Sequence, residues 1–255
     1  MATENTAPKM MAGELVKDPI QIRKIEEEIK KKKDFEIVVA ELQKLGKLDK
    51  AELKVTGVYN YDATTENNGI FVNQLVTLEV SDHTASIEFF KFEGAEVSGE
   101  YFNGQIVSDR VITGINVNDS RVKLVFAKEA EVAQISPLEL EKAPVIEDYK
   151  PGIFNEMIGT EAWNEFCFDW EAGGVEYNHC GKQCGNWGKY GGGSMVNRID
   201  SCCYMHDYCY KYDQQSEACC DEDLVYCAYN NRSSDPWMYQ QINAYYGWAA
   251  AVCRK

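Results

Sequence analysis

The sequence predicts an α+β protein of two domains: an N-terminal helix plus antiparallel β-meander, then a mainly helical, disulfide-rich domain. Three observations support this fold class. All ten cysteines and all five tryptophans lie after residue 162 of the 255, which divides the chain by composition. Apolar residues recur at helical spacing before residue 46, and with a period of two between residues 53 and 128. Around residue 206, two pairs of cysteines share one spacing.

The N-terminal domain is expected to span residues 1–128. The first 17 residues are polar and predicted to be disordered. Asp18-Pro19 marks a helix start, and residues 35–45 form a second helical pattern that ends at Gly46. Turn signals at 67–69, 102–104 and 118–119 separate the expected strands. These strands are residues 53–59, 70–80, 85–92, 97–101, 105–117 and 121–127.

Residues 129–152 are acidic, contain three prolines and show no sustained period, so a linker is predicted there. The second domain then spans residues 153–255. Helical spacing is expected over residues 154–170 and 237–252, with Cys253 fixing the C-terminal run. No catalytic constellation appears in residues 1–128, which leaves a binding, folding or inhibitory role, including that of a pro-region.

Composition bounds the function. The net charge is −15 and no block is basic, so no nucleic-acid partner is expected. No apolar run approaches the length of a membrane span. Ten cysteines close together indicate a disulfide scaffold in a secreted or otherwise oxidising location. The first 34 residues nevertheless lack the apolar core of a signal peptide.

The cysteine spacing is typical of two stapled helices. Cys202 and Cys209 lie seven residues apart, as do Cys220 and Cys227, and seven residues make about two helical turns. Two antiparallel helices would therefore be compatible with bridges from Cys202 to Cys227 and from Cys209 to Cys220. His206 lies between the first pair at offsets of four and three, so it is expected to face the partner helix.

Two carboxylates accompany this histidine. Asp221 follows Cys220 directly, within expected reach of His206, and Asp207 is a hard oxygen ligand one step around the helix. A glycine-rich loop, residues 188–193, precedes them. A histidine oriented by a carboxylate, beside an aspartate and a glycine-rich loop, predicts a general base next to a metal.

These motifs resemble the secreted phospholipase A2 family. Residues 200–210 read Asp-Ser-Cys-Cys-Tyr-Met-His-Asp-Tyr-Cys-Tyr, which matches the family pattern Asp-x-Cys-Cys-x-x-His-Asp-x-Cys-Tyr. The family's third-helix pattern, Cys-Asp followed six residues later by Cys, appears at Cys220, Asp221 and Cys227. The resemblance covers residues 180–230 and implies a calcium-dependent hydrolase that cleaves the sn-2 ester of glycerophospholipids at a membrane surface. The products would be a fatty acid and a lysophospholipid.

The resemblance also implies roles for individual residues. His206 would be the general base, Asp221 would orient it, and Tyr210 would support Asp221 by a hydrogen bond. Ca²⁺ would be held by the carboxylate of Asp207 and by backbone carbonyls. In the ungapped register those carbonyls belong to Asn186, Gly188 and Tyr190.

The chain departs from the family pattern in three places. Trp187 and Tyr190 stand where the family usually has cysteine and glycine, so a shifted register with the carbonyls of 183, 185 and 187 is an alternative. No long insertion lies between Tyr210 and Cys219, which favours the compact form of bacterial and fungal members.

Three other functions remain open on the sequence. Cys180, Cys184, Cys203 and His206 are a candidate zinc set. The second domain is alternatively a non-catalytic toxin or binding module on the same scaffold. It is alternatively an antimicrobial released from a precursor by cleavage in residues 129–152. Intramolecular regulation by residues 1–128 is a further expectation.

Overall fold

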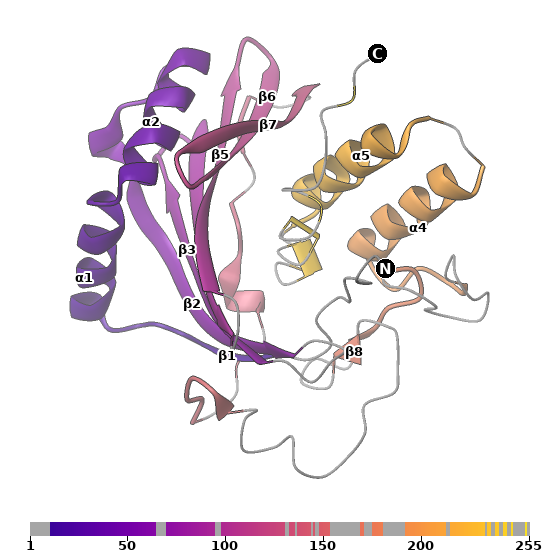
Figure 1. Ribbon diagram of the computed structural model, residues 1–255, viewed down its shortest axis with the longest axis horizontal. Coiled ribbons are helices and arrows are strands. Elements are labelled where there is room, and N and C mark those ends of the chain that lie inside the picture. Colours follow the sequence, from indigo (N-terminus) through magenta and orange to yellow (C-terminus); the bar gives the residue numbers. More distant parts are fainter. Residues whose placement is uncertain are drawn as a thin grey trace.

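In the computed structural model, an antiparallel sheet region is followed by a C-terminal helical region with disulfides (Figure 1). The structure describes residues 11–64, 70–94, 98–130, 133–135, 137–143, 145, 148–153, 169–170, 175–180, 192–212, 215–232, 234–235, 238–239, 242–243, 246 and 253.

Both helices predicted before residue 46 are confirmed. Helix α1 (Pro19–Lys30) begins after Asp18, whose side chain accepts a hydrogen bond from the amide of Ile20 at 2.9 Å. The proline at the start loses no helical hydrogen bond, because the first amides of a helix have no partner within it. Helix α2 (Lys33–Leu45) ends at Gly46, as predicted.

Seven strands form one antiparallel sheet in the order of the sequence, so the predicted meander is confirmed. Residues 11–15 join it as β1 and pair with β2, so the expected disorder of the first 17 residues is wrong for this stretch. A short 3₁₀ helix, η1 (Lys50–Glu52), leads into β2. The strands are β1 (Met11–Leu15), β2 (Lys54–Thr64), β3 (Ile70–Glu79), β4 (Ala85–Gly94), β5 (Ser98–Ser108), β6 (Val111–Asn118) and β7 (Arg121–Glu129).

Two hairpin turns separate β5 from β6 and β6 from β7, and the first of them corrects the predicted strand boundaries. Asp109 and Arg110 have φ values of 50° and 62°, and Asp119 and Ser120 have 49° and 62°. Two consecutive positive φ values are typical of type I′ turns, whose twist matches that of the flanking strands. The second turn lies where it was predicted. The first divides the single strand expected over residues 105–117 into β5 and β6.

The turn predicted at residues 102–104 is wrong, because these residues lie inside β5. Asn103 is buried, and its side-chain oxygen accepts a hydrogen bond from the amide group of Asn116 at 2.8 Å. A Cβ atom on Gly104 would meet Cγ2 of Val38 at 2.6 Å. Gly104 therefore lets α2 pack closely on the sheet, and the Asn-Gly pair does not reverse the chain.

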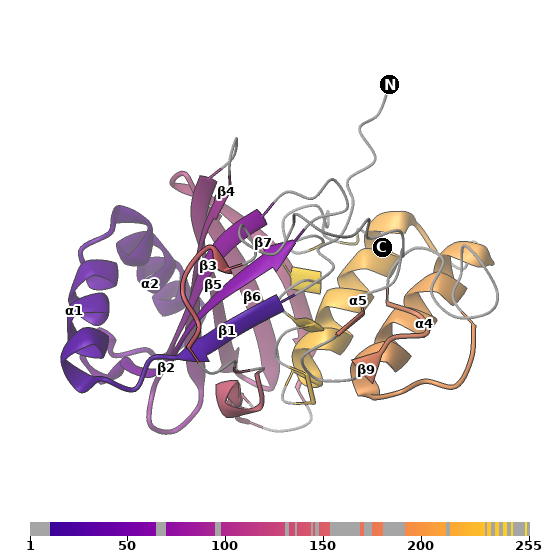
Figure 2. The ribbon, with the colours of Figure 1, turned by 90° about the horizontal axis from the view of Figure 1, so that it is seen from below.

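The two faces of the sheet have different partners. Helices α1 and α2 cover one face, and the C-terminal region lies against the other (Figure 2). On the helix side, the core is apolar and continuous. Its larger members are Ile29, Phe35, Val38, Leu42, Leu53, Val58, Val76, Leu78, Ile87, Phe89, Phe102, Ile106, Ile115 and Val117.

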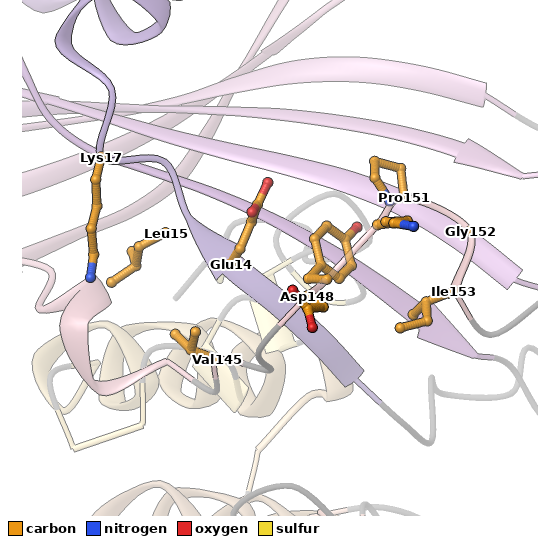
Figure 3. Close-up of a pocket in the computed structure, with 10 residues that line it drawn as sticks. Glu14, Leu15, Lys17, Val145, Asp148, Pro151, Gly152 and Ile153 are labelled. Carbon is orange, nitrogen blue, oxygen red and sulfur yellow. The ribbon is translucent and has the colours of Figure 1, made fainter.

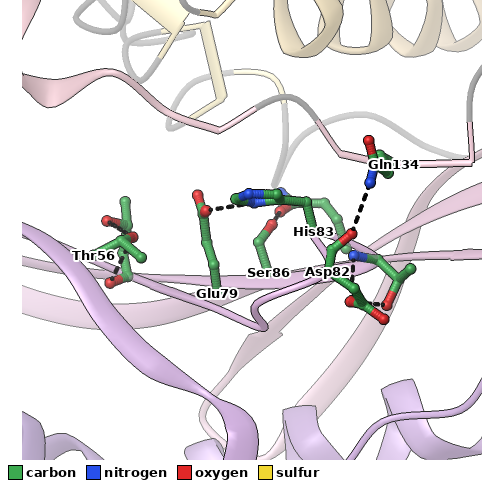
Figure 4. Close-up of polar contacts among 9 residues, drawn as sticks. Thr56, Glu79, Asp82, His83, Ser86 and Gln134 are labelled. Carbon is green, nitrogen blue, oxygen red and sulfur yellow. Dashed lines mark hydrogen bonds and ion pairs between the residues drawn. The ribbon is translucent and has the colours of Figure 1, made fainter.

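The other face carries a buried polar row across its middle. Thr77, Glu88, Asn103 and Asn116 lie opposite one another on four successive strands. Nearby, Glu79 contacts the imidazole of His83 at 3.2 Å (Figure 4). His83 lies between β3 and β4 with a φ of 57°.

Residues 138–143 pack on this same face. Leu138, Leu140 and Ala143 are buried in the core that the sheet shares with the C-terminal region. The hydroxyl of Tyr149 donates a 2.7 Å hydrogen bond to the fully buried Asp62 of β2. This stretch includes the 3₁₀ helix η2 (Leu140–Lys142).

A pocket of about 1000 Å³ lies between β1 and residues 148–153 (Figure 3). No predicted site residue lines it. Its lining consists of Glu14, Leu15, Lys17, Val145, Asp148, Tyr149, Lys150, Pro151, Gly152 and Ile153.

The C-terminal region contains helices α4 (Arg198–Lys211) and α5 (Glu217–Asn230) and a small hairpin of β8 (Asp169–Trp170) and β9 (Val175–Glu176). The helix predicted over residues 154–170 is wrong at its end, since residue 170 is in β8. Residues 154–168 lie outside the described part. In the described stretches, no helix is long and apolar enough to cross a membrane.

Candidate active site

The two stapled helices form as the cysteine spacing predicts. Cys202 of α4 is bonded to Cys227 of α5, and Cys209 to Cys220, with Cα–Cα distances of 5.7 and 5.9 Å. Equal spacing of the two pairs requires antiparallel helices in one register. The face of α4 between the bridges, which carries His206, therefore lies against α5, and His206 is only 6% exposed.

Helix α5 brings a carboxylate to this histidine. Nε2 of His206 lies 2.9 Å from Oδ1 of Asp221, and the hydroxyl of Tyr210 donates to the same oxygen at 2.7 Å. Burial, and then the hydrogen bond to Asp221, raise the pKa of Tyr210 above its ordinary value, so it stays a donor. With Nε2 donating to Asp221, the other ring nitrogen of His206, Nδ1, carries a lone pair that can accept a proton.

Asp207 has an unsatisfied buried oxygen. Its Oδ2 atom has no hydrogen-bond partner, although it is inaccessible to solvent. Burial, and then the negative charge of Asp200, raise the pKa of Asp207 to about 7. A buried carboxylate without a partner is costly, and a divalent cation would offset this cost. Asp207 thus has the chemistry expected of a calcium ligand.

Asp200 organises the chain on both sides of the glycine-rich loop. This fully buried carboxylate accepts hydrogen bonds from the backbone amides of Asn178, His179, Cys180 and Val196, at 2.8 to 3.3 Å. Residues 178–180 and 196 flank the loop, so one side chain holds both of its ends at the start of α4.

Further bonds hold the described end of this loop. Nε2 of His179 lies 3.2 Å from the carbonyl oxygen of Gly193, and the amide of Gly192 donates to the carbonyl of Asn178 at 3.0 Å. Gly193 has a φ of +127°, a conformation that other residues rarely adopt. The predicted carbonyl ligands at Asn186, Gly188 and Tyr190, and the alternatives at 183, 185 and 187, lie outside the described residues.

The alternative zinc site of Cys180, Cys184, Cys203 and His206 is wrong for two of its four ligands. Cys180 and Cys203 form a disulfide with a Cα–Cα distance of 5.0 Å, so neither sulfur is a free thiolate. Among the residues that the structure describes, no three histidine, cysteine or acidic side chains are grouped to hold a metal. Asp207 would therefore bind a metal together with oxygen donors of another kind, such as carbonyls.

The sequence interpretation missed two residues of the site. His179, in the bend before Cys180, is 2% exposed, and its ring lies 5.0 Å from that of Tyr204. Tyr246 contacts His206 edge-on, with ring centroids 5.0 Å apart. The expected tether at Cys253 is confirmed by a disulfide to Cys219. No spacing rule links residue 246 to residue 206, because only the folded C-terminal segment brings them together.

Comparisons with known proteins add one relative. No protein-family profile matches the chain, and no solved structure matches it. A stretch of 67 residues is 37% identical to the basic phospholipase A2 β-bungarotoxin A-AL4 chain of Bungarus multicinctus. The matched stretch is 26% of this chain and spans 42% of the length of that relative. Over this quarter of the protein, the chain is similar to a phospholipase A2.

Proposed function

We propose that the C-terminal region is a calcium-dependent phospholipase A2 that hydrolyses the sn-2 ester of glycerophospholipids. The observation that supports this most is the joint geometry of His206, Asp221 and Asp207. A histidine held at one nitrogen by a carboxylate leaves its other nitrogen for proton transfer. The neighbouring aspartate has the unsatisfied oxygen that a calcium ion would use. The partial similarity to a phospholipase A2 chain agrees with this proposal.

His206 performs the proton transfers in this mechanism. Its Nδ1 accepts a proton from a water molecule as the water oxygen attacks the carbonyl carbon of the ester. The positive charge that then develops on the ring is stabilised by Asp221, which accepts the Nε2 proton in a hydrogen bond. When the ester bond breaks, the same proton passes from Nδ1 to the departing alcohol oxygen, leaving a fatty acid and a lysophospholipid.

Tyr210 and Asp207 have supporting roles. The hydroxyl of Tyr210 fixes the oxygen of Asp221 that receives the histidine, so the imidazole keeps one orientation. Asp207 would hold calcium together with backbone carbonyls of the glycine-rich loop, for which Asn186, Gly188 and Tyr190 are the proposed donors. Bound calcium supplies positive charge that polarises the ester carbonyl and stabilises the negative charge on its oxygen.

The setting of this activity follows from the same proposal. The substrate class places the enzyme at a phospholipid surface as a peripheral protein. The four disulfides of the described residues fit an oxidising compartment, such as the outside of the cell.

The direct test is fatty-acid release from phosphatidylcholine vesicles labelled in the sn-2 chain, with the full-length protein. Release is expected with calcium and not with a chelator, and His206→Gln should remove it. A matched control is His83→Gln, since His83 lies in a turn of the sheet away from this dyad. Calcium-independent release, or full activity of His206→Gln, would contradict the mechanism.

A second function is favoured by one observation, because the relative's name identifies a toxin chain. In this alternative, the C-terminal region is a non-catalytic binding or toxin module on the same scaffold, or such a module released from a precursor. Calcium binding without any fatty-acid release, from the full-length protein or from its separated C-terminal region, would favour it.

A further inference from the structure

Strand β7 of the sheet region lies along α5, the helix that carries Asp221 (Figure 1). Nζ of Lys128 lies 3.2 Å from a carboxylate oxygen of Glu222 and 3.0 Å from one of Asp223. The hydroxyl of Tyr226 donates to the backbone carbonyl of Glu129 at 3.2 Å. The sheet therefore contacts the residues that directly follow the proposed dyad acid.

Glu222 joins this contact to the end of the chain. It is 4% exposed, and its second carboxylate oxygen accepts a hydrogen bond from the amide of Cys253 at 2.6 Å. Lys123, on the same strand as Lys128, is near enough to Asp221 for electrostatic interaction. Burial lowers the pKa of Lys123, and the negative charge of Asp221 acts in the opposite direction. Both lysines place the positive charge of β7 beside an acidic turn of α5.

A second contact holds the C-terminal segment, which we define by its described residues Met238, Tyr239, Ile242, Asn243 and Tyr246. The hydroxyl of Tyr239 lies 3.0 and 3.3 Å from the two carboxylate oxygens of Glu88, in the polar row of the sheet. Both residues are buried, and Asn243 donates to the same hydroxyl at 3.4 Å. A buried polar contact of this kind favours one arrangement of its partners, because its loss removes a hydrogen bond from a buried carboxylate.

The segment reaches from the sheet to the dyad. Tyr239 and Tyr246 are seven residues apart in this segment. One end bonds Glu88 of the sheet, and the other end sets its ring against His206. His206 is 6% exposed in this arrangement, with the ring of Tyr246 packed edge-on against its imidazole.

We propose that the sheet region is a built-in inhibitor of the C-terminal region, which keeps Tyr246 over His206 through Glu88 and holds α5 through Lys128. This inference rests on the proposed hydrolase function for its consequence, but its contacts are independent of any activity. Substrate access then requires the segment to leave the sheet.

The test measures the exposure of His206 directly in the full-length protein. Diethyl pyrocarbonate modifies accessible imidazoles, and peptide mapping by mass spectrometry resolves the three histidines of the chain. His83, whose side chain is 40% exposed, serves as the reactive reference, and the buried His179 reports on unfolding of the C-terminal region. Fatty-acid release with calcium is measured on the same samples.

Two variants should weaken the contacts between the sheet region and the C-terminal region. Tyr239→Phe removes the hydroxyl that bonds Glu88 but keeps the ring in the core, and Lys128→Glu replaces attraction to Glu222 and Asp223 by repulsion. Loss of a hydrogen bond to a carboxylate shifts such an equilibrium about tenfold, so His206 should be modified about tenfold faster. Fatty-acid release should rise in parallel, with His179 still protected.

The controls have the same chemistry elsewhere. Tyr149→Phe removes a hydroxyl that bonds a buried carboxylate, Asp62 of β2, off the path to His206. Lys91→Glu reverses an exposed lysine of β4 that lies on the opposite face by strand alternation. Neither should change the modification of His206 more than about twofold.

The outcomes distinguish failure of the inhibitor inference from failure of the proposed hydrolase function. Unchanged modification of His206 in both Tyr239→Phe and Lys128→Glu overturns the inference. Faster modification with unchanged release from an active wild type also overturns it. If His206 is modified faster but no protein, wild type or variant, releases fatty acid, the proposed hydrolase function is overturned. The inference that the sheet region keeps His206 covered is then supported. If Tyr239→Phe also exposes His179, Lys128→Glu alone decides, because Lys128 is partly exposed and its replacement leaves the core intact.

Discussion

Oδ1 of Asp221 receives both the imidazole of His206 and the hydroxyl of Tyr210, at 2.9 and 2.7 Å. One oxygen atom thus sets the orientation of the proposed base and is itself held by a second donor. Because both contacts end on the same atom, a substitution at Asp221 or at Tyr210 should alter the orientation of His206. The bond from Asp221 acts directly, and the bond from Tyr210 acts through Asp221.

We expect Asp221→Asn to lower kcat by about 100-fold or more, since the neutral amide cannot stabilise the imidazolium. Tyr210→Phe should lower it less than about tenfold, because the bond between His206 and Asp221 remains. Calcium affinity, measured by isothermal titration calorimetry, should be unchanged in both. A Tyr210→Phe enzyme as inactive as Asp221→Asn would contradict this ranking.

Asp207→Asn should abolish calcium binding and also stabilise the metal-free protein. The first effect follows from loss of a charged oxygen ligand. The second follows because the amide removes a buried carboxylate whose pKa is raised to about 7. We expect a gain on the order of 1 kcal/mol in unfolding free energy, by denaturant titration at pH 8 with a chelator. A loss of stability in that buffer would show that Asp207 is already satisfied without a metal.

Removing the Cys209–Cys220 disulfide by a double serine substitution should cost about 3 kcal/mol, as estimated for a closed loop of this length. Activity should fall beyond what unfolding explains, since Cys220 directly precedes Asp221. The matched control is the Cys219–Cys253 bridge, which holds the C-terminal end instead. Equal loss of specific activity from both double variants would argue against a special role for the first bridge.

Glu88 predicts a pH dependence of stability. Burial raises its pKa from 4.5 to about 7, while the charge of Arg232 and the Tyr239 hydroxyl oppose this and Glu79 adds to it. The folded protein therefore binds this proton more tightly than the unfolded chain does. This contribution to stability is complete below about pH 4.5, is lost as the pH rises to about 7, and stays absent above it.

Glu88→Gln keeps the size of the side chain and has no charge to lose. The difference in unfolding free energy between wild type and Glu88→Gln should therefore change by about 3 kcal/mol between pH 4.5 and 7.5. The matched variant is Glu100→Gln, whose carboxylate pairs with Lys32 near the surface. A pH-independent difference for Glu88→Gln would show that this carboxylate is ionised throughout.

Much of the fold could be predicted from local patterns. The cap at Asp18, the glycine after α2 and the alternation in the meander each act over a few residues, and each gave an element of the right type. The turn predicted at Asn103-Gly104 was wrong because Gly104 is needed for the close packing of α2, which a local turn rule does not include. The hairpin at Asp109 and Arg110 lacks glycine and asparagine, so its sequence carries little turn signal.

The site could be predicted in part for the same reason. Matched cysteine spacings and helix periodicity bring His206 and Asp221 together, and the structure bears out that contact. Tyr246, Glu88 and Lys128 could not be assigned to the site. They reach it only through the packing of the sheet against the C-terminal region, at sequence separations that no periodicity connects.

Glu222 binds the ammonium of Lys128 from the sheet and the backbone of Cys253 near the other end of the chain. The two halves of the protein are thus held together by contacts that do not depend on the peptide bonds between them. A protease that cut between residues 130 and 153 would leave a non-covalent complex, which would run as two bands under denaturing conditions and as one species in native separation. Covalent processing and the uncovering of His206 would then be separate events in the life of this protein.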